Sequence, residues 1–211
     1  TQNQAFSALL FLYKQVLKID LDRIQDVRRA KRTPNLPVVL TRQETRKVLN
    51  QLPGNQRLIC ALMYGSGLRL LECLRLRIKD IDFERREITV RQGKGGKDRR
   101  TVLSDGLVRS LQSHLRKVRN RHEQDRKLNQ GYVELPMALA RKFPRASTSW
   151  LWQWVFPATR TYLHQETGER RRHHYHESAL QRAVPIAALE AGITKRVTCH
   201  TFRHTFATHL L

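Results

Sequence analysis

Apolar residues recur at intervals of three or four along most of the chain, which predicts a largely helical protein. The first such stretch, about residues 4–18, predicts an amphipathic helix. A capping-box pattern at 41–44 (TRQE) then opens a second helix, and Asn55 is the candidate N-cap of a third. Gly65 and Gly67 are expected to end that third helix, because glycine readily adopts the left-handed conformation.

The period changes to two after residue 82. Segments 87–91 and 99–103 alternate like strands, and the glycine-rich stretch between them, QGKGGKD, predicts an antiparallel hairpin with a lysine-bearing tip. The tip lacks the spacing of a nucleotide-binding P-loop. Helical spacing resumes after Ser104, the expected N-cap, and again over 177–191. The pattern therefore predicts an α+β fold, mainly α-helical, with a small antiparallel β-hairpin or sheet.

The last stretch, CHTFRHTFATHLL, carries a polar face. If it is helical, His200, Arg203 and His204 share one side, and its two phenylalanines form an apolar ridge on the other. A guanidinium fork beside two imidazoles is suited to binding a phosphate.

A second candidate anion site follows the glycine turn. Arg69 comes directly after it, and Glu72 lies three residues on, on the same helical face. One interpretation is an ordinary surface ion pair, which contributes little to stability. The other is an anion-binding role for Arg69, since helix starts favour negative charge.

Composition favours nucleic acid as the partner. The 211 residues contain 40 Lys and Arg against 18 Asp and Glu, a formal net charge of +22. Neutralising phosphates with such a surplus releases counterions. An anionic membrane surface is less favoured, and no apolar run is long enough to span a bilayer. The three widely spaced cysteines are expected to be reduced, packed thiols.

Residues 129–177 gather aromatic side chains beside RRRHHYH. The segment could form a second piece of core, or its aromatic rings could stack on unpaired bases; the pattern leaves both open. Histidines four apart could chelate a metal ion, but there is no HExxH and no paired CxxC, so no metal and no other cofactor is expected.

Three motifs resemble those of tyrosine recombinase catalytic domains in order and spacing: GSGLRLLE (65–72), QGKGGKDRR (92–100) and HTFRHTFATHL (200–210). The segments LPMALARKFP, WQWVFP and RRHHYHESALQRAV resemble the insertion of the integron integrases. The resemblance implies three parts: the end of a core-binding, SAM-like domain (1–30), a basic linker (31–37), and a catalytic domain (38–211) with the insertion at about 129–177.

The resemblance also implies a reaction and a set of residues. A tyrosine attacks a DNA phosphodiester, leaving a 3′-phosphotyrosine and a free 5′-hydroxyl, and two exchanges recombine two sites without metal or ATP. The implied catalytic residues are two phosphate-clamping arginines, an acidic residue that orders the site, a general-acid lysine and a histidine: Arg69, Arg203, Glu72, Lys94 and His200. Lys97 is the rival general acid. The implied DNA-binding residues, the last four of them against extrahelical bases, are Lys97, Arg99, Trp152, Trp154, His173 and His174.

The nucleophile is the main departure from the family pattern. The family expects it in a motif beyond Leu211, and none of the five tyrosines stands in that context. We therefore expect a fragment that binds DNA, folded single-stranded or duplex, without cleaving it. The full-length protein is expected to form a homotetramer on paired sites in the bacterial cytoplasm, at the nucleoid. The alternatives are a non-catalytic DNA-binding module of the same fold and, less favoured without acidic clusters, a metal- or nucleotide-dependent nuclease.

Overall fold

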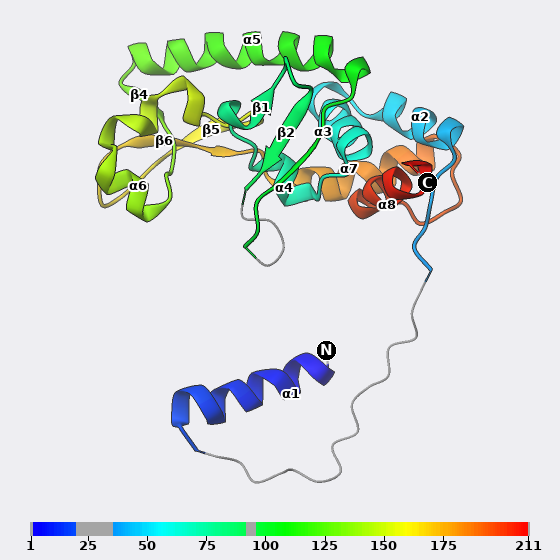
Figure 1. The fold of residues 1–211 in the computed structure, drawn as a ribbon, viewed down its shortest axis with the longest axis horizontal. Coiled ribbons are helices and arrows are strands. Elements are labelled where there is room, and N and C mark those ends of the chain that lie inside the picture. The colour runs from blue at the N-terminus through cyan, green and yellow to red at the C-terminus, as the bar shows by residue number, and fades with distance from the viewer. Residues whose placement is uncertain (1, 20–35, 92–95, 211) are drawn as a thin grey trace. The chain divides into compact units, whose positions relative to one another are not determined.

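The computed structural model describes residues 2–19, 36–91 and 96–210, and the chain divides into two compact units, Thr1–Leu36 and Pro37–Leu211 (Figure 1). In the first unit, helix α1, Gln2–Phe11, continues as a turn of π-helix, η1, Leu12–Leu17. This confirms a helix in the predicted place, while its amphipathic character stays a prediction. None of the residues of these two helices is buried. The assignment of residues 1–30 to a core-binding domain stays a prediction.

The second unit is built mainly from helices. The capping box at the start of α2 is confirmed: Thr41 Oγ1 accepts from the backbone of Glu44 at 3.1 Å, and a Glu44 carboxylate oxygen accepts from the backbone of Thr41 at 2.7 Å. The helices that surround the core of this unit are α2 (Arg42–Gln51), α3 (Gly54–Ser66), α4 (Leu70–Leu74), α7 (Glu177–Glu190) and α8 (Cys199–Leu210).

The predicted start of α3 needs correction, and of the two glycines expected at its end only Gly67 ends it. Its N-cap is Pro53, in an extended conformation, so Asn55 lies inside the first turn and the predicted Asn55 cap is wrong. Gly65 also lies inside the helix. Gly67, in contrast, ends it as predicted, with a left-handed φ of 61°. The helix therefore ends at Ser66, and after Gly67 and Leu68 the chain reaches Arg69, which is the N-cap of α4.

The predicted hairpin is confirmed as part of a three-stranded antiparallel sheet. Strand β2 (Glu87–Val90) pairs with β3 (Arg99–Val102), with Val90 opposite Arg99 and Glu87 opposite Val102. The pattern missed the short edge strand β1 (Ile81–Asp82) on the other side of β2. Lys94 lies outside the described residues.

The segment predicted as an insertion forms a second sheet. Strand β6 (Arg170–His174) pairs antiparallel with β5 (Pro157–Leu163) and parallel with β4 (Gln130–Tyr132). Between β4 and β5 lie α6 (Met137–Lys142) and two 3₁₀ turns, η3 (Pro144–Thr148) and η4 (Trp150–Trp152).

Helix α5, Asp105–Lys127, joins the two halves of this unit. It runs along one side of the unit and contacts both α3 and β4 (Figure 1). Near its end, Asp125 forms a bidentate salt bridge with Arg172 of β6, at 2.8 and 2.9 Å. Arg172 also donates to the carbonyls of Ala158 and Thr159. This pair links the second sheet to α5, and because both charged side chains are nearly buried, removing either one would leave the other charge without its partner.

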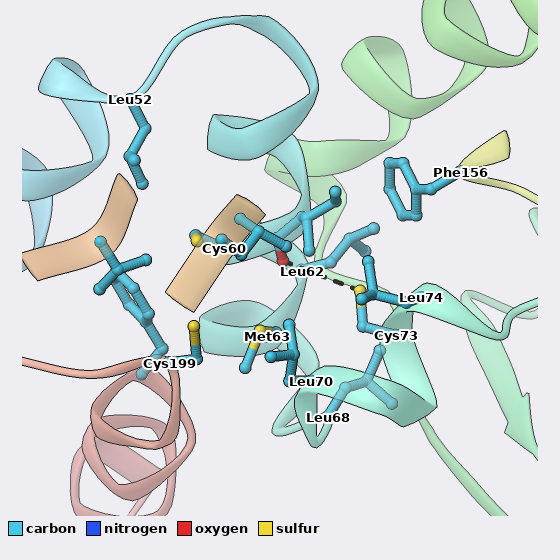
Figure 2. Close-up of a cluster of buried hydrophobic side chains, with 14 of the residues drawn as sticks. Leu52, Cys60, Leu62, Met63, Leu68, Leu70, Cys73, Leu74, Phe156 and Cys199 are labelled. Carbon is cyan, nitrogen blue, oxygen red and sulfur yellow. Dashed lines mark hydrogen bonds between the residues drawn. The ribbon is translucent and has the colours of Figure 1, made fainter. Parts of the chain in front are cut away.

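The core lies around α3 and includes all three cysteines as free thiols, Cys60, Cys73 and Cys199 (Figure 2). Burial raises the pKa of each thiol, that of Cys199 to about 11. This agrees with the predicted packed, reduced cysteines. Within residues 2–19, 36–91 and 96–210, no helix has the length and hydrophobicity to cross a membrane. Within the same ranges no three His, Cys, Asp or Glu residues are grouped as a metal would require.

Candidate functional site

Arg69 and Glu72 form more than a surface ion pair. Arg69 is the N-cap of α4, directly after the glycine turn, and Glu72 is the third residue of that helix. A Glu72 oxygen accepts from the Arg69 backbone at 2.8 Å, and the other accepts from Arg69 Nη1 at 2.7 Å. The Glu72 side chain is only 10% exposed, against 35% for Arg69. The carboxylate therefore holds the arginine at the protein surface.

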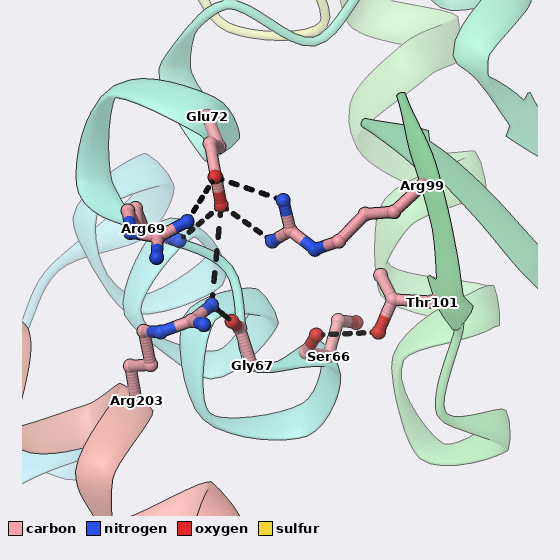
Figure 3. Close-up of polar contacts among 7 residues, drawn as sticks. All are labelled: Ser66, Gly67, Arg69, Glu72, Arg99, Thr101 and Arg203. Atoms are coloured by element: carbon pink, nitrogen blue, oxygen red, sulfur yellow. Dashed lines mark hydrogen bonds and ion pairs between the residues drawn. The ribbon is translucent and has the colours of Figure 1, made fainter. Parts of the chain in front are cut away.

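A second guanidinium reaches the same carboxylate from the sheet. Arg99, the first residue of β3, donates Nη1 to Glu72 Oε1 at 2.9 Å and Nη2 to Oε2 at 2.6 Å (Figure 3). Such parallel pairs are among the strongest side-chain contacts. Arg99 was expected as a DNA-binding residue, and its role in organising the site was missed because 27 residues separate the partners.

The third guanidinium comes from the last helix. Arg203 of α8 donates Nη1 to the backbone oxygen of Gly67 and lies 4.0 Å from Glu72 Oε2 (Figure 3). The predicted helix is confirmed, and Phe202 on its far side is fully buried. The sequence therefore placed Arg69 and Arg203 correctly on helical elements, and the fold brings them to one carboxylate.

The cluster keeps a positive surplus. Burial on its own raises the pKa of Glu72, but hydrogen bonds from Arg99 and Arg69 outweigh it and lower the pKa to about 2. Burial and the nearby Arg69 lower the pKa of Arg203, although a guanidinium stays protonated at neutral pH. Three cations thus surround one anion, and the two positive charges left over favour an anionic ligand.

A groove of about 710 Å³ opens beside the cluster. Arg69 and Glu72 lie at its edge, and Trp152 and Trp154 of the second sheet region line it too. Its other charged lining residues are mostly cationic: Arg75, Arg77, Lys79, Asp80, Arg91 and Asp98. Basic residues thus outnumber acidic ones along the lining, and this positive surplus suits a polyanion.

The remaining predicted catalytic residues are less constrained. His200 is exposed on the first turn of α8, and no hydrogen bond of its ring was found among the described residues. Lys97 is exposed just before β3, while Lys94 lies outside the described residues. His204, also on α8, is exposed. Their catalytic roles stay predictions.

The four predicted base-contacting residues divide into two pairs. Trp154 is 7% exposed, and its indole N–H donates to the carbonyl of Arg172 at 3.1 Å, while His174 is buried and bonds the Tyr175 carbonyl. Both side chains are buried, which leaves little of either ring open to a base. Trp152 is half-buried and His173 is exposed. The core interpretation therefore holds for Trp154 and His174, while base stacking by Trp152 and His173 stays a prediction.

Arg77 was missed by the sequence analysis. It donates to the carbonyls of Trp152 and Glu134, each at 2.7 Å, and its guanidinium lies 3.2 Å from the ring centroid of Trp154. Burial lowers its pKa to about 10. Arg77 follows α4 closely, so it fixes the second sheet region against the segment that carries Glu72. Nothing in its sequence context distinguishes it from the other arginines.

Known proteins are similar to this chain in sequence and fold. Residues 39–211 match the sequence profile of the phage integrase family. An integrase/recombinase of Escherichia coli is 45% identical over 211 residues, all of this chain and 63% of that protein. The tyrosine recombinase XerA of Pyrococcus furiosus is 30% identical over 193 residues, 90% of this chain and 54% of that protein. The chain thus spans less than two thirds of the length of these relatives.

Solved structures of recombinases have a similar fold. The crystal structure of XerA recombinase superimposes with a TM-score of 0.55 at 25% identity, covering 99% of this chain and 61% of that one. XerH recombinase bound to its difH substrate, in a pre-cleavage complex, gives 0.56 at 22% identity, covering 100% and 54%. These likenesses confirm the predicted fold, a mainly helical recombinase catalytic domain with a small antiparallel sheet. Together with the profile match over nearly the whole second unit, they place the chain in the phage integrase family of tyrosine recombinases.

Proposed function

We propose that the second unit binds DNA and holds a phosphodiester between Arg69 and Arg203, as the catalytic domain of a site-specific recombinase. The observation that carries this proposal is the cluster of three arginines on the Glu72 carboxylate, at the edge of an electropositive groove. A phosphorane transition state gathers negative charge on its non-bridging oxygens. Guanidinium groups already fixed in place stabilise that charge without reorganising.

In the proposed reaction a tyrosine oxygen forms a bond to phosphorus as the bond to the 5′-oxygen breaks. The tyrosine gives up its proton, and a general acid protonates the leaving 5′-oxygen. We assign the acid to Lys94, with Lys97 as its rival, and proton transfer at the attacking side to His200. The reverse attack by a 5′-hydroxyl of the partner strand restores the phosphodiester, so no cofactor is consumed.

For the 211-residue polypeptide itself we propose DNA binding without cleavage. The polar contacts of the arginine cluster within the described residues involve no tyrosine. Tyr64 bonds His209 instead, and Tyr175 bonds Gln56. A covalent complex formed by this polypeptide on DNA would contradict the proposal.

DNA as the partner is supported by the net charge of +22 and by the fold shared with XerH, which was solved on its difH substrate. Binding to a labelled duplex is expected to weaken steeply with salt, as counterion release requires. A logarithm of affinity that stays flat against the logarithm of salt concentration would refute a phosphate-dominated interface. We further propose that the full-length protein acts as a tetramer on paired sites at the bacterial nucleoid.

The finer proposal is an integron-type integrase that recognises folded single-stranded sites. Its support is the aromatic region next to the groove, where Trp152 lies under the ammonium of Lys79, 3.0 Å from the ring centroid. The other ring face of Trp152, and the exposed His173, are then the candidates to pack on an extrahelical base. Stacking of that kind contributes about 1–3 kcal/mol per base.

The base-recognition proposal is tested with two DNA hairpins that differ only in one extrahelical base. The chain is expected to prefer the hairpin with the extra base, and Trp152→Ala to remove most of that preference while leaving binding to the plain hairpin. Leu151→Ala, at the exposed neighbouring position, is the matched control. Equal affinity of the unchanged chain for both hairpins would refute the integron-type assignment but not the phosphate clamp.

The catalytic assignment is tested in the complete gene product that contains this chain. On a nicked suicide substrate, Arg203→Ala is expected to abolish covalent DNA attachment and largely spare DNA binding. Arg109→Ala, an exposed arginine on α5, is the control. If the Arg203 variant still forms the covalent complex at the normal rate, the clamp assignment fails. If the unchanged protein forms no covalent complex, the alternative of a non-catalytic DNA-binding module gains support.

A further inference from the structure

Arg99 lies on strand β3 with its side chain turned toward α4 rather than away from the protein. Its side chain is 33% exposed, and its guanidinium donates to both oxygens of Glu72, at 2.9 and 2.6 Å. The contact raises the pKa of Arg99 and helps to lower that of Glu72. The next residue, Arg100, is exposed on the opposite face of the strand and pairs with Glu87 at 3.5 Å.

This bidentate contact limits how many hydrogen bonds Glu72 can form with Arg69 and Arg203. A carboxylate has two oxygens, and an arginine with no competitor tends to take both in a bidentate pair. With Arg99 in place, Arg69 bonds Oε1 through one side-chain nitrogen only, and Arg203 stays 4.0 Å from Oε2. Nitrogens of Arg69 and Arg203 therefore remain available to a ligand instead of being taken up by Glu72.

The same contact joins the hairpin to the clamp. Arg99 is the first β3 residue after the tip, paired in register with Val90. Two residues on, Thr101 Oγ1 donates to the carbonyl of Ser66 at the end of α3, at 2.7 Å. These two side chains share one face of β3 and attach it at two points, so the hairpin base cannot shift without disturbing Glu72 (Figure 3).

We propose that Arg99 is a positioning residue of the phosphate clamp: by occupying both oxygens of Glu72 it keeps Arg69 and Arg203 open to a phosphate and sets the hairpin base beside them. This inference rests on the proposed phosphate clamp. It assigns to Arg99 no contact with the reacting atoms.

The geometry, and not only the charge, is what Arg99 supplies. A lysine at this position keeps the positive charge but cannot form two parallel bonds with one carboxylate. Arg99→Lys is therefore the informative variant, and Arg99→Gln removes charge and geometry together. Arg100→Lys and Arg100→Gln are matched controls, since they make the same changes one residue away without contacting Glu72.

The experiment follows the arginine Nε–H resonances of the ¹⁵N-labelled 211-residue chain by NMR during titration with inorganic phosphate at low salt. Phosphate is expected to shift the resonances of Arg69 and Arg203 and to leave that of Arg99 nearly unchanged. In Arg99→Lys the phosphate affinity at Arg69 and Arg203 is expected to fall about tenfold, the change expected for one lost charge-assisted bond. The Arg100 variants are expected to bind phosphate as the unchanged chain does.

The possible outcomes distinguish a failure of the positioning role of Arg99 from a failure of the phosphate clamp. Normal phosphate affinity in Arg99→Lys, with a loss only in Arg99→Gln, means that Arg99 supplies charge alone and overturns the positioning role. Phosphate that shifts neither Arg69 nor Arg203 in the unchanged chain refutes the clamp itself. If Arg99→Lys does not fold, the rotation rate of the Arg99 guanidinium is measured by NMR in the unchanged chain, with and without phosphate. Slowed rotation in both conditions supports the bidentate pair with Glu72, and free rotation overturns it.

Discussion

Gly67→Ala is expected to destabilise the second unit more than any other glycine-to-alanine change within its described residues. Gly67 has a left-handed φ of 61° at the end of α3. A Cβ there would lie 2.4 Å from two ring carbons of Phe206 on α8, closer than non-bonded carbon atoms approach one another. The substitution therefore combines backbone strain with a steric clash, and the clash pushes on the helix that carries Arg203.

The two effects can be estimated separately. A left-handed conformation costs a residue with a Cβ about 1–2 kcal/mol. Forcing a packed side chain out of its position costs about 1–3 kcal/mol in a close-packed interior. Because Phe206 is only partly buried, its ring has some room to yield, and we expect a total loss of about 2–4 kcal/mol in the free energy of unfolding.

Urea unfolding followed by tryptophan fluorescence measures this loss, since all three tryptophans lie in the second unit. Two glycines provide controls. Gly54 has a φ of 43° and nothing within 4 Å of the added Cβ, so Gly54→Ala reports the backbone cost alone. Gly106 lies in α5 with equally open surroundings, so Gly106→Ala is expected to gain about 0.5–1 kcal/mol.

The reasoning also predicts the response of a double variant. Phe206→Leu in the Gly67→Ala background is expected to recover part of the loss, because the smaller side chain relieves the clash and leaves the backbone strain. If Gly67→Ala costs no more than Gly54→Ala, α8 does not pack against the glycine turn as described. The positions of Arg203 and of the clamp would then need revision.

Three further predictions test other parts of the structure. The pKa of Glu72 is lowered from 4.5 to about 2, so its contribution to stability is complete above about pH 5 and is lost as the pH falls toward 2. The difference in free energy of unfolding between the unchanged chain and Glu72→Gln should therefore shrink over that pH interval. A difference that stays constant with pH contradicts this. Asp125→Ala leaves Arg172 without its carboxylate partner and should lower the free energy of unfolding, measured by urea titration, by about 3–5 kcal/mol. The control, Glu123→Ala at an exposed position, should lower it by less than about 0.5 kcal/mol. Equal losses would count against the buried pair. The three buried thiols, with raised pKa values, should react with N-ethylmaleimide only after unfolding, and rapid labelling of the native chain, seen by mass spectrometry, would show that they are accessible.

Local signals predicted the local parts of this fold. The capping box at Thr41 and the glycine turn before Arg69 act within a few residues, so the sequence places both helix starts correctly. The hairpin follows from its alternation. The prediction of Asn55 as the N-cap was wrong because Pro53 is the extended residue before the helix and Gly54 adopts a left-handed conformation at its start. Competing local signals thus differ by too little for the sequence to decide between them.

Long-range pairs could not be predicted from the pattern. The bond between Arg99 and Glu72 spans 27 residues, and that between Asp125 and Arg172 spans 47. In a chain with 40 basic residues, many arginines could in principle pair with a given acid. Which one does depends on how the sheets pack. The aromatic segment shows the same limit: Trp152 and Trp154 are two apart, yet a 3₁₀ turn followed by extended chain buries only the second.

The end of α3 explains how three arginines can share one small region. The last carbonyls of a helix lack partners within it and carry the negative end of its dipole. Here Ser66 and Gly67 present their carbonyls to Thr101 of β3 and to Arg203 of α8. One helix end therefore attaches both neighbouring elements and partly offsets the repulsion between the guanidinium groups. Together with Glu72 it holds Arg69 and Arg203 close before any ligand arrives, which is the condition for a clamp that binds phosphate without reorganising.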